Sequence, residues 1–493
     1  MFKGRAPCAS VCTLLVAALA GCAVGPDYQR PASSLDADFV NAGASASNTQ
    51  PPDADIATFW RGFNDARLNA LIERALAANG DIRIAQARLQ EARANQGEAD
   101  AGGLPGLSIE GNVTRSVRPI TQQPGTSRSG RTGTSYGASF IANWELDFFG
   151  RYRRGSEAAA AFVEASAAGL QGAHTTVAAE VARNYLALRG LQQRQTVAEA
   201  ALVNQREALR IVSARLDAGR GTQLDMTRAQ ALVASTEASL PALQSAVERT
   251  VFRLATLTAQ SPRALLGELA VPAALPSLPI TDLAALPVGT TEQWLQRRPD
   301  IAAAERQLAA ATATIGVARS EMFPRISLSG LLGLNAATFG NLGKSESRIY
   351  SLGVGLVWTP FDFGAIRSRI AASEARAQNS LATYEQTVAT ALEETEGAFS
   401  GYTRSAQRAE RLLIAATSAE EAAQLARLRF DAGVTDFLVV LDAEREVLTN
   451  RDQLVQAQTD TATALVNVYR ALGGGWAAPV TVATATRTLR ASW

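Results

Sequence analysis

The sequence predicts an α+β protein in which one unit of about 200 residues is used twice and pairs of strands alternate with very long helices. Three observations lead to this prediction. The motif Arg-Phe-Asp-Ala-Gly at 429–433 repeats Arg-Leu-Asp-Ala-Gly at 215–219, 214 positions earlier. Two short segments in each half alternate apolar and polar residues. Long stretches without proline, rich in Ala, Glu, Gln, Arg and Leu, follow each pair of segments.

The first residues have the features of a bacterial export signal with a lipid attachment site. Basic residues precede a short apolar run, and Leu-Ala-Gly-Cys occupies 19–22. We expect cleavage before Cys22 and acylation of its thiol, with 1–21 as the signal peptide and 22–58 as an acylated tether. By analogy with lipoprotein sorting, Ala23 favours the outer membrane. All three cysteines lie in this N-terminal part, so no disulfide is expected in the mature chain.

The remaining chain divides into two repeats and two shorter segments. Each repeat is expected to hold a helix, two strands and a long helical hairpin. A proline-rich linker separates the repeats, and a tail of similar composition follows the second. The expected bounds are 59–260 for repeat 1, 261–293 for the linker, 294–472 for repeat 2 and 473–493 for the tail.

Each repeat opens with helical patterning, in repeat 1 from about Phe63 to Ala99, and then changes to a period of two. Each strand has about the nine to eleven residues that a tilted strand needs to cross a bilayer. Aromatic residues at strand ends are typical of a membrane-facing girdle, but a soluble sandwich gives the same alternation. The apolar series are Leu107 to Val113, Tyr136 to Leu146, Ile326 to Leu334 and Tyr350 to Trp358, and the aromatic ends are Tyr136, Trp144, Tyr350 and Trp358.

The segments 151–217 and 365–431 lack proline and predict helices of about 100 Å, at 1.5 Å per residue. Return helices are expected at about 222–257 and 436–472. Pro241 lies in the first of them and is expected to kink or break it. Rods of this length must bury an apolar seam against neighbouring helices.

Four strands are too few to close a membrane barrel, and open strand edges are not tolerated in lipid. After the signal segment, no run approaches the roughly 18 apolar residues of a membrane helix. A chain that spans a membrane with these strands must therefore contribute them to an oligomer. Because each chain supplies four strands, the barrel can have any multiple of four strands. The strand count alone does not show that the oligomer has three chains.

Three motifs resemble the TolC-type outer-membrane factors, most closely their efflux lipoprotein branch, the OprM/NodT type. They are the start at 19–28, Arg298-Pro299-Asp300-Ile301, and Gly433 followed by Leu441-Asp442-Ala443. The resemblance covers essentially the whole mature chain. It implies a trimeric, twelve-stranded outer-membrane β-barrel continued by a long periplasmic α-helical barrel, with the linker and the tail at its equator.

The resemblance also implies function and partners. Proteins of this type are passive exit ducts that conduct small molecules such as drugs to the exterior as part of tripartite efflux pumps. The implied partners of the homotrimer are a periplasmic adaptor (membrane fusion) protein, an inner-membrane proton-driven transporter and outer-membrane lipid. The implied location is the cell outer membrane, with a lipid anchor and an extension into the periplasm.

A periplasmic gate, held nearly shut and opening like an iris, is implied at Asp442 and Arg445 and at Asp225 and Arg228. Asp and Arg three positions apart share one helical face, which alone predicts a surface ion pair worth a fraction of a kcal/mol. A ring of like carboxylates around a narrow opening would instead repel itself and attract cations. Phe430 occupies a position where relatives often carry Tyr, so a hydroxyl bond cannot form there.

The hairpin tips are expected to be tight turns between helices. Glycine permits the turn, and helices are expected to restart after Thr222 and Thr435, which supply N-caps. Adaptor docking in the grooves beside these tips is a hypothesis that the resemblance adds. The tip residues are Gly219, Gly221, Thr222, Gly433, Val434 and Thr435.

The sequence contains no recognisable set of catalytic residues. His174 is the only histidine, and its repeat partner is Val388. Gly-Lys-Ser at 343–345 resembles a phosphate loop, but Thr338 stands where that motif requires Gly. No enzyme, cofactor or metal site is therefore expected. The net charge of +1 gives no reason to expect nucleic acid as a partner.

Two other functions remain open at this stage. The first is the outer-membrane component of a type I protein-secretion system, although the lipoprotein start favours efflux. The second is a lipid-anchored periplasmic coiled-coil scaffold or adaptor. An adaptor typically has one hairpin and needs no paired strands, so the duplication and the four alternating segments argue against it.

Overall fold

The computed structural model describes residues 23–32, 39–41, 57–280 and 291–475. Cys22, the signal segment and parts of the tether, linker and tail lie outside the described residues. The chain divides into two compact units. Unit 1 is Met1–Ala32, Arg88–Ala167 and Ala303–Glu385, and unit 2 is Ser33–Ala87, Ala168–Ala302 and Gln386–Trp493.

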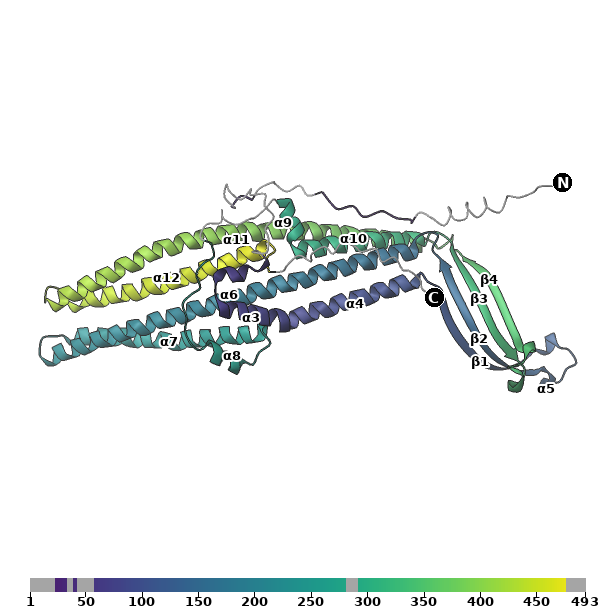
Figure 1. Ribbon diagram of the computed structural model, residues 1–493, viewed down its shortest axis with the longest axis horizontal. Helices are drawn as coiled ribbons and strands as arrows, with labels where there is room; N and C mark the ends of the chain where they lie inside the picture. Colours follow the sequence, from purple (N-terminus) through teal and green to yellow (C-terminus); the bar gives the residue numbers. More distant parts are fainter. Residues whose placement is uncertain (1–22, 33–38, 42–56, 281–290, 476–493) are drawn as a thin grey trace, which may run out of the picture. The chain divides into compact units, whose positions relative to one another are not determined.

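Two shorter helices, two strands and a long helical hairpin follow one another in the same order in each half of the chain (Figure 1). The first half has η1 (Phe59–Phe63), α3 (Ala66–Ala78), α4 (Gly80–Gly102), β1 (Gly106–Val117), η2 (Ile120–Gln122), α5 (Arg128–Arg131), β2 (Thr132–Leu146), α6 (Arg151–Asp217), α7 (Gln223–Leu257) and α8 (Pro262–Leu269). The second has α9 (Thr291–Arg297), α10 (Pro299–Ser320), β3 (Arg325–Ala336), η4 (Phe339–Asn341), η5 (Ser345–Ser347), β4 (Arg348–Val357), α11 (Ala365–Asp431) and α12 (Phe437–Ala471).

The two copies agree in the lengths of their long helices. Helices α6 and α11 each have 67 residues, and α7 and α12 each have 35. The internal repeat is therefore confirmed. Among the described residues, no helix combines the length and the apolar character that crossing a membrane would require.

The single helix expected from Phe63 to Ala99 is wrong, because the chain breaks at Asn79 between α3 and α4. The Asn79 side-chain oxygen accepts hydrogen bonds from the backbone N–H of Asp81 at 2.8 Å and of Ile82 at 3.3 Å. Asn79 therefore caps the start of α4. The second repeat breaks similarly, with α10 beginning at Pro299, where the missing N–H has no helical partner to lose.

A kink or a break was also expected at Pro241, and the break is wrong, because α7 continues through this residue. Pro241 and Glu237, four residues earlier, are both exposed. Water can therefore pair with the Glu237 carbonyl that the proline ring leaves without its helical donor. The cost is one ladder bond in a helix of 35 residues.

The four strands form one antiparallel sheet in the order β1-β2-β3-β4 (Figure 1). Their pairing places every predicted apolar series on the same face, as Ile109 with Phe140, Phe140 with Leu332, and Leu332 with Tyr350. The alternate positions carry residues such as Ser139 and Ser329 on the other face. The predicted strands are thus confirmed, although β1, β2 and β3 have 12, 15 and 12 residues and exceed the expected length.

Much of the apolar face of the sheet is exposed. Ile109 on β1 is 74% exposed and Leu352 on β4 is 78% exposed. Within the described residues, β1 pairs only with β2 and β4 only with β3, so each presents an unpaired edge. Tyr350 and Trp144 lie near strand ends as expected, whereas Tyr136 is the fifth residue of β2, because that strand begins at Thr132.

Residues 23–32 belong to the expected tether, but the structure holds them against α6 and α10 in unit 1. The buried Arg154 side chain donates hydrogen bonds to the Val24 carbonyl at 3.3 Å and to the Asp27 carboxylate at 2.6 Å. Gly25 (φ +105°) crosses Gly316 so closely that a Cβ on Gly25 would lie 2.5 Å from the Gly316 Cα. This segment is named the strap below.

Candidate functional site

The α6–α7 and α11–α12 hairpins turn in the same way. Gly219 has φ +69°, and the N–H of Arg220 donates to the Arg215 carbonyl at 2.8 Å. In the second hairpin Gly433 has φ +72°, and the N–H of Val434 donates to the Arg429 carbonyl at 2.8 Å. Each glycine thus ends a long helix in the left-handed conformation that a residue with a Cβ adopts at a cost.

The helices that follow the two turns begin differently. Thr222 caps α7, since its hydroxyl oxygen accepts from the N–H of Asp225 at 3.1 Å and donates to the Asp225 carboxylate at 2.6 Å. Asp436 occupies the equivalent position before α12 and makes no side-chain cap bond. The expected cap at Thr435 is therefore wrong by one residue, because that threonine matches Gly221 rather than Thr222.

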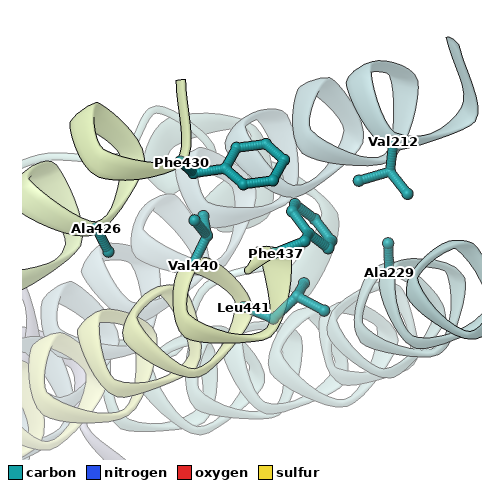
Figure 2. Packing of buried hydrophobic residues seen from close by; sticks show 7 residues of the cluster. All are labelled: Val212, Ala229, Ala426, Phe430, Phe437, Val440 and Leu441. Carbon is teal, nitrogen blue, oxygen red and sulfur yellow. The ribbon is translucent and has the colours of Figure 1, made fainter. Parts of the chain in front are cut away.

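An apolar cluster near the tips joins all four long helices (Figure 2). The Phe430 ring lies 5.3 Å from the Phe437 ring, and the Arg215 guanidinium lies over the Phe430 ring at 4.0 Å from its centroid. Because the cluster draws on both hairpins, it fastens them to each other. Its buried members are Val212 on α6, Ala229 on α7, Ala426 and Phe430 on α11, and Phe437, Val440 and Leu441 on α12.

The charged residues of the predicted gate lie on α7 and α12. Asp442, Arg445 and Arg228 are exposed, whereas Asp225 is half-buried and bonded to Thr222. In the described part of the chain, neither predicted Asp–Arg pair is within ion-pair distance.

Arg228 and Asp442 are each the sixth residue of their helix. The repeat therefore places charges of opposite sign at equivalent positions. The partners of Asp225 and Arg445 in this alignment are Val439 and Ala231, which are uncharged.

A groove of about 520 Å³ lies between α6 and α7 beside the first tip. Two arginines on its wall are paired with glutamates, Arg206 with Glu237 at 2.6 Å and Arg210 with Glu207 at 2.6 Å. The predicted docking tips Gly219 and Gly221 lie just beyond it. Its lining residues are Arg206, Leu209, Arg210, Ser213, Ala214, Asp217, Met226 and Gln230.

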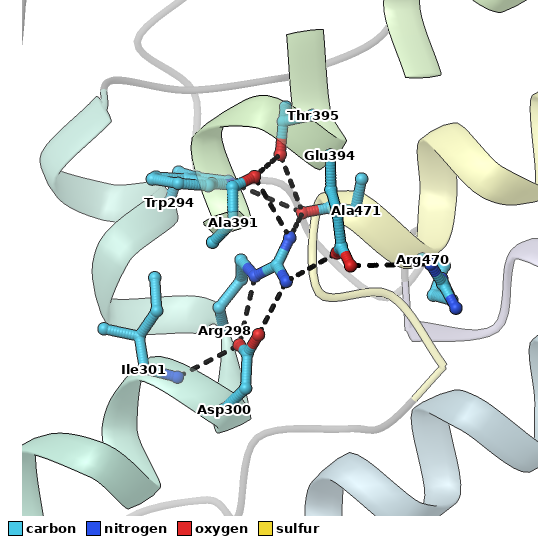
Figure 3. Close-up of polar contacts among 9 residues, drawn as sticks. All are labelled: Trp294, Arg298, Asp300, Ile301, Ala391, Glu394, Thr395, Arg470 and Ala471. Atoms are coloured by element: carbon cyan, nitrogen blue, oxygen red, sulfur yellow. Dashed lines mark hydrogen bonds and ion pairs between the residues drawn. The ribbon is translucent and has the colours of Figure 1, made fainter. Parts of the chain in front are cut away.

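A buried arginine holds the other end of the second hairpin (Figure 3). Arg298, from the sequence motif noted above, donates to the last carbonyl of α12, that of Ala471, at 3.1 Å. It also contacts Asp300 at 2.6 Å and Glu394 at 2.9 Å. These hydrogen bonds raise the pKa of Arg298 despite its burial. Trp294 donates to the same Ala471 carbonyl at 3.1 Å.

The described residues hold no cluster of three or more His, Cys, Asp or Glu that could bind a metal ion. His174 is half-buried on α6, and burial lowers its pKa.

The comparisons with known proteins identify the family. The family model described as "Outer membrane efflux protein" matches residues 71–260 and 290–474. The chain belongs to this outer membrane efflux protein family.

Similar proteins agree with this assignment. The efflux protein is 32% identical over 480 residues to the outer membrane protein OprJ of Pseudomonas aeruginosa, covering 96% of this chain and 97% of OprJ. It is 29% identical to the solvent efflux pump outer membrane protein SrpC of Pseudomonas putida, covering 93% and 96% of the two chains. The solved structure of the outer-membrane channel OprN is 40% identical in sequence and has a TM-score of 0.85. The match covers 92% of this chain and 100% of the OprN chain.

For this efflux protein, the predicted fold class of long paired helices, four strands per chain and an internal repeat is confirmed. The tip residues Phe430 and Asp442 were predicted as gate residues from the family resemblance, and the structure places both near the hairpin tips. Sequence reasoning missed Asn79 and the tie between Arg298 and α12. The repeat itself could have indicated this pair, because Asn79 and Arg298 stand at the same place, two residues before Asp81 and Asp300.

Proposed function

We propose that the chain is the exit duct of a tripartite efflux pump and passively conducts small molecules such as drugs from the periplasm across the outer membrane. The distribution of residues on the two faces of the sheet and its open edges support this proposal. One face is apolar and largely exposed, the other carries mostly small and polar residues, and within the described residues each edge strand has one edge without a partner strand. Lipid suits the first face, and a water-filled lumen suits the second.

Closure of the sheet requires further copies of the chain. With three copies, β1 of one chain pairs with β4 of the next, and twelve strands close into a barrel without edges. The helical hairpins then form a barrel of their own in the periplasm. Relatives that belong to efflux pumps support the choice of this assembly over a scaffold.

The gate lies at the hairpin tips and opens like an iris. Six hairpins in a trimer place Arg228 and Asp442 alternately around the opening, so that each positive side chain has a negative neighbour. Phe430 and its cluster hold the two hairpins of one chain together. Opening therefore separates neighbouring chains, while Asp225 and Arg445 line the approach to the opening.

The assembly has an anchor and two protein partners. Acylated Cys22 anchors the chain in the outer membrane, and the strap sets where this anchor sits, because Ala23 lies against Gly150. A periplasmic adaptor docks at the tips, at Gly219, Gly221 and Thr222 and at Gly433, Val434 and Thr435. A proton-driven transporter in the inner membrane supplies the cargo.

The mass of the detergent-solubilised mature protein, measured by light scattering with the detergent subtracted, tests the assembly. Three chains are expected. Single-channel conductance in planar bilayers and restored drug resistance in an efflux-deficient bacterium that also expresses the matching pump and adaptor test the function. A monomer with open strand edges, or trimers that never conduct, would overturn the proposal.

A further inference from the structure

Two arginines interrupt the apolar face of the sheet, both at the end that carries the strand-to-strand loops. Arg115 continues the series of Leu107, Ile109 and Val113 on β1. Arg348 begins the series of β4, since its pairing with Leu334 places it on the apolar face. Both side chains are exposed. Each edge strand therefore has an arginine on its apolar face near the loop end, Arg115 two residues before the end of β1 and Arg348 at the start of β4.

The loops next to these arginines add positive charge. Residues 111–144 contain no Asp and no Glu, and the β3–β4 loop has one acidic residue, Glu346, beside Lys344. Arg131 uses its guanidinium to hold the Arg118 carbonyl at 2.7 Å, which orders the first loop. None of the cations at this end forms an ion pair within the described residues. They are Arg115, Arg118, Arg128, Arg131, Lys344 and Arg348.

The opposite end of the sheet is different, because acidic residues lie beside its arginines and pair with two of them, although Arg325 has no ion pair within the described residues. Arg151 contacts Glu145 at 3.2 Å, and Arg153 contacts Asp147 at 3.3 Å. The excess of positive charge is thus concentrated at the loop end. An arginine on a lipid-facing strand is costly at mid-bilayer and tolerated near the interface, where its long side chain can reach polar headgroups.

We propose that Arg115 and Arg348, with the cations of the adjoining loops, bind phosphate groups of the outer-leaflet lipid, those of a phosphorylated glycolipid. This inference rests on the proposed function, which puts the apolar face in lipid and the loops outside. Pairing of β1 with β4 of the next chain brings the two arginines to the same end of the seam between chains. Guanidinium groups bind phosphate with two parallel hydrogen bonds, so two of them at each seam hold a diphosphorylated headgroup.

The test measures binding of diphosphorylated lipid A to the detergent-solubilised, full-length mature protein. Arg115→Gln combined with Arg348→Gln is expected to weaken binding about ten- to thirty-fold, since one basic residue near a phosphate surface contributes about fivefold. The matched control is Arg325→Gln, which removes an exposed strand arginine at the other end of the sheet. The double lysine variant keeps the charge and is expected to retain most of the affinity.

Each outcome decides for or against the inference. Equal binding by the double glutamine variant and the Arg325→Gln control would overturn it. Displacement of lipid A by millimolar inorganic phosphate would also overturn it, by showing a site for the free ion. Trimer mass and conductance are recorded for every variant. A trimer that conducts but shows no difference in lipid binding removes this inference alone, whereas loss of trimers and conductance in the unmodified protein removes the proposed function.

Discussion

Asn79 and Arg298 occupy the same place in the two repeats and perform the same task with different chemistry. The Asn79 amide donates to the last carbonyl of α7, that of Leu257, at 2.9 Å, and the Arg298 guanidinium donates to the last carbonyl of α12, that of Ala471. Each residue therefore ties the base of a hairpin to the break between two shorter helices. The first tie is neutral, and the second is an ion-pair network with Asp300 and Glu394.

Arg298→Ala is expected to destabilise the protein by about 1–3 kcal/mol, because it removes the buried donor to the Ala471 carbonyl, while water can hydrate the partly exposed carboxylates of Asp300 and Glu394. Asn79→Ala is expected to cost about 1–3 kcal/mol, the range for an unpaired buried polar group. Denaturant titration of the detergent-solubilised trimers measures both. The exposed Arg404→Ala serves as control, and equal losses for Arg298→Ala and Arg404→Ala would refute this account of the tie.

Phe430→Ala is expected to loosen the contact between the two hairpins of a chain, because it removes a buried ring from the apolar cluster, a change that costs about 3–5 kcal/mol in a well-packed core. The two hairpins of one chain can then also move apart, which adds a second way of opening to the separation of neighbouring chains, and the open probability in bilayer recordings rises. Leu438→Ala, at a partly exposed position on α12, is the matched control. A recording in which both variants stay closed like the parent would contradict this role.

Arg228→Asp and Asp442→Arg are each expected to open the gate, since each places like charges side by side in the ring of tips. The double variant restores alternating signs and is expected to recover the low conductance of the parent. Both changes lie on exposed helical surface, so folding is little affected. If the increases in conductance of the two single variants simply add in the double variant, the two side chains do not interact.

The strap gives a prediction about proteolysis. Arg154→Ala removes the donor to the Val24 carbonyl and the Asp27 carboxylate. We expect a protease to remove the N-terminal segment several-fold faster from this variant, as local opening becomes easier. Arg153→Ala, one residue earlier and bonded to Asp147 instead, is the control. Identical cleavage rates in the two variants would count against a role of Arg154 in holding the strap.

Acid is expected to weaken the contact between α3 and α8. Arg74 donates to both carboxylate oxygens of Glu268, at 2.9 and 2.6 Å, and these bonds lower the pKa of Glu268. A lowered pKa in the folded state stabilises the protein above the unfolded value of about 4.3, and this contribution is lost as pH falls through the folded value. Arg74→Gln should flatten the decline of stability between about pH 5 and 3. The difference stays below about 1 kcal/mol, since both groups are partly exposed.

Much of the fold could be predicted because its signals are local and repeated. A period of two identified all four strands, and the shared Asp-Ala-Gly motif located both tips. The breaks at Asn79 and Pro299 and the continuity of α7 through Pro241 could not be read in this way. They depend on which carbonyls find a donor from a distant segment or from water, and that is decided by tertiary contacts such as Asn79 with Leu257.

The same reason limits prediction of the site. Phe430 and Asp442 were predicted from the family resemblance, which does not indicate that Phe430 packs against Phe437 and Arg215. The Asp–Arg spacing suggested pairs within one helix. The equivalence of Arg228 and Asp442 instead follows from the repeat offset of 214 positions, and the structure agrees, because each is the sixth residue of its helix.

The equal lengths of the two hairpins restrict how this protein can change in evolution. One residue inserted in α6 would lengthen that helix by about 1.5 Å and shift its packing register against α7. A matching insertion in α7 would restore the first hairpin but leave its tip beyond that of α11 and α12. A longer or shorter duct therefore requires four coordinated insertions or deletions in one gene, whereas single substitutions can tune the tips freely.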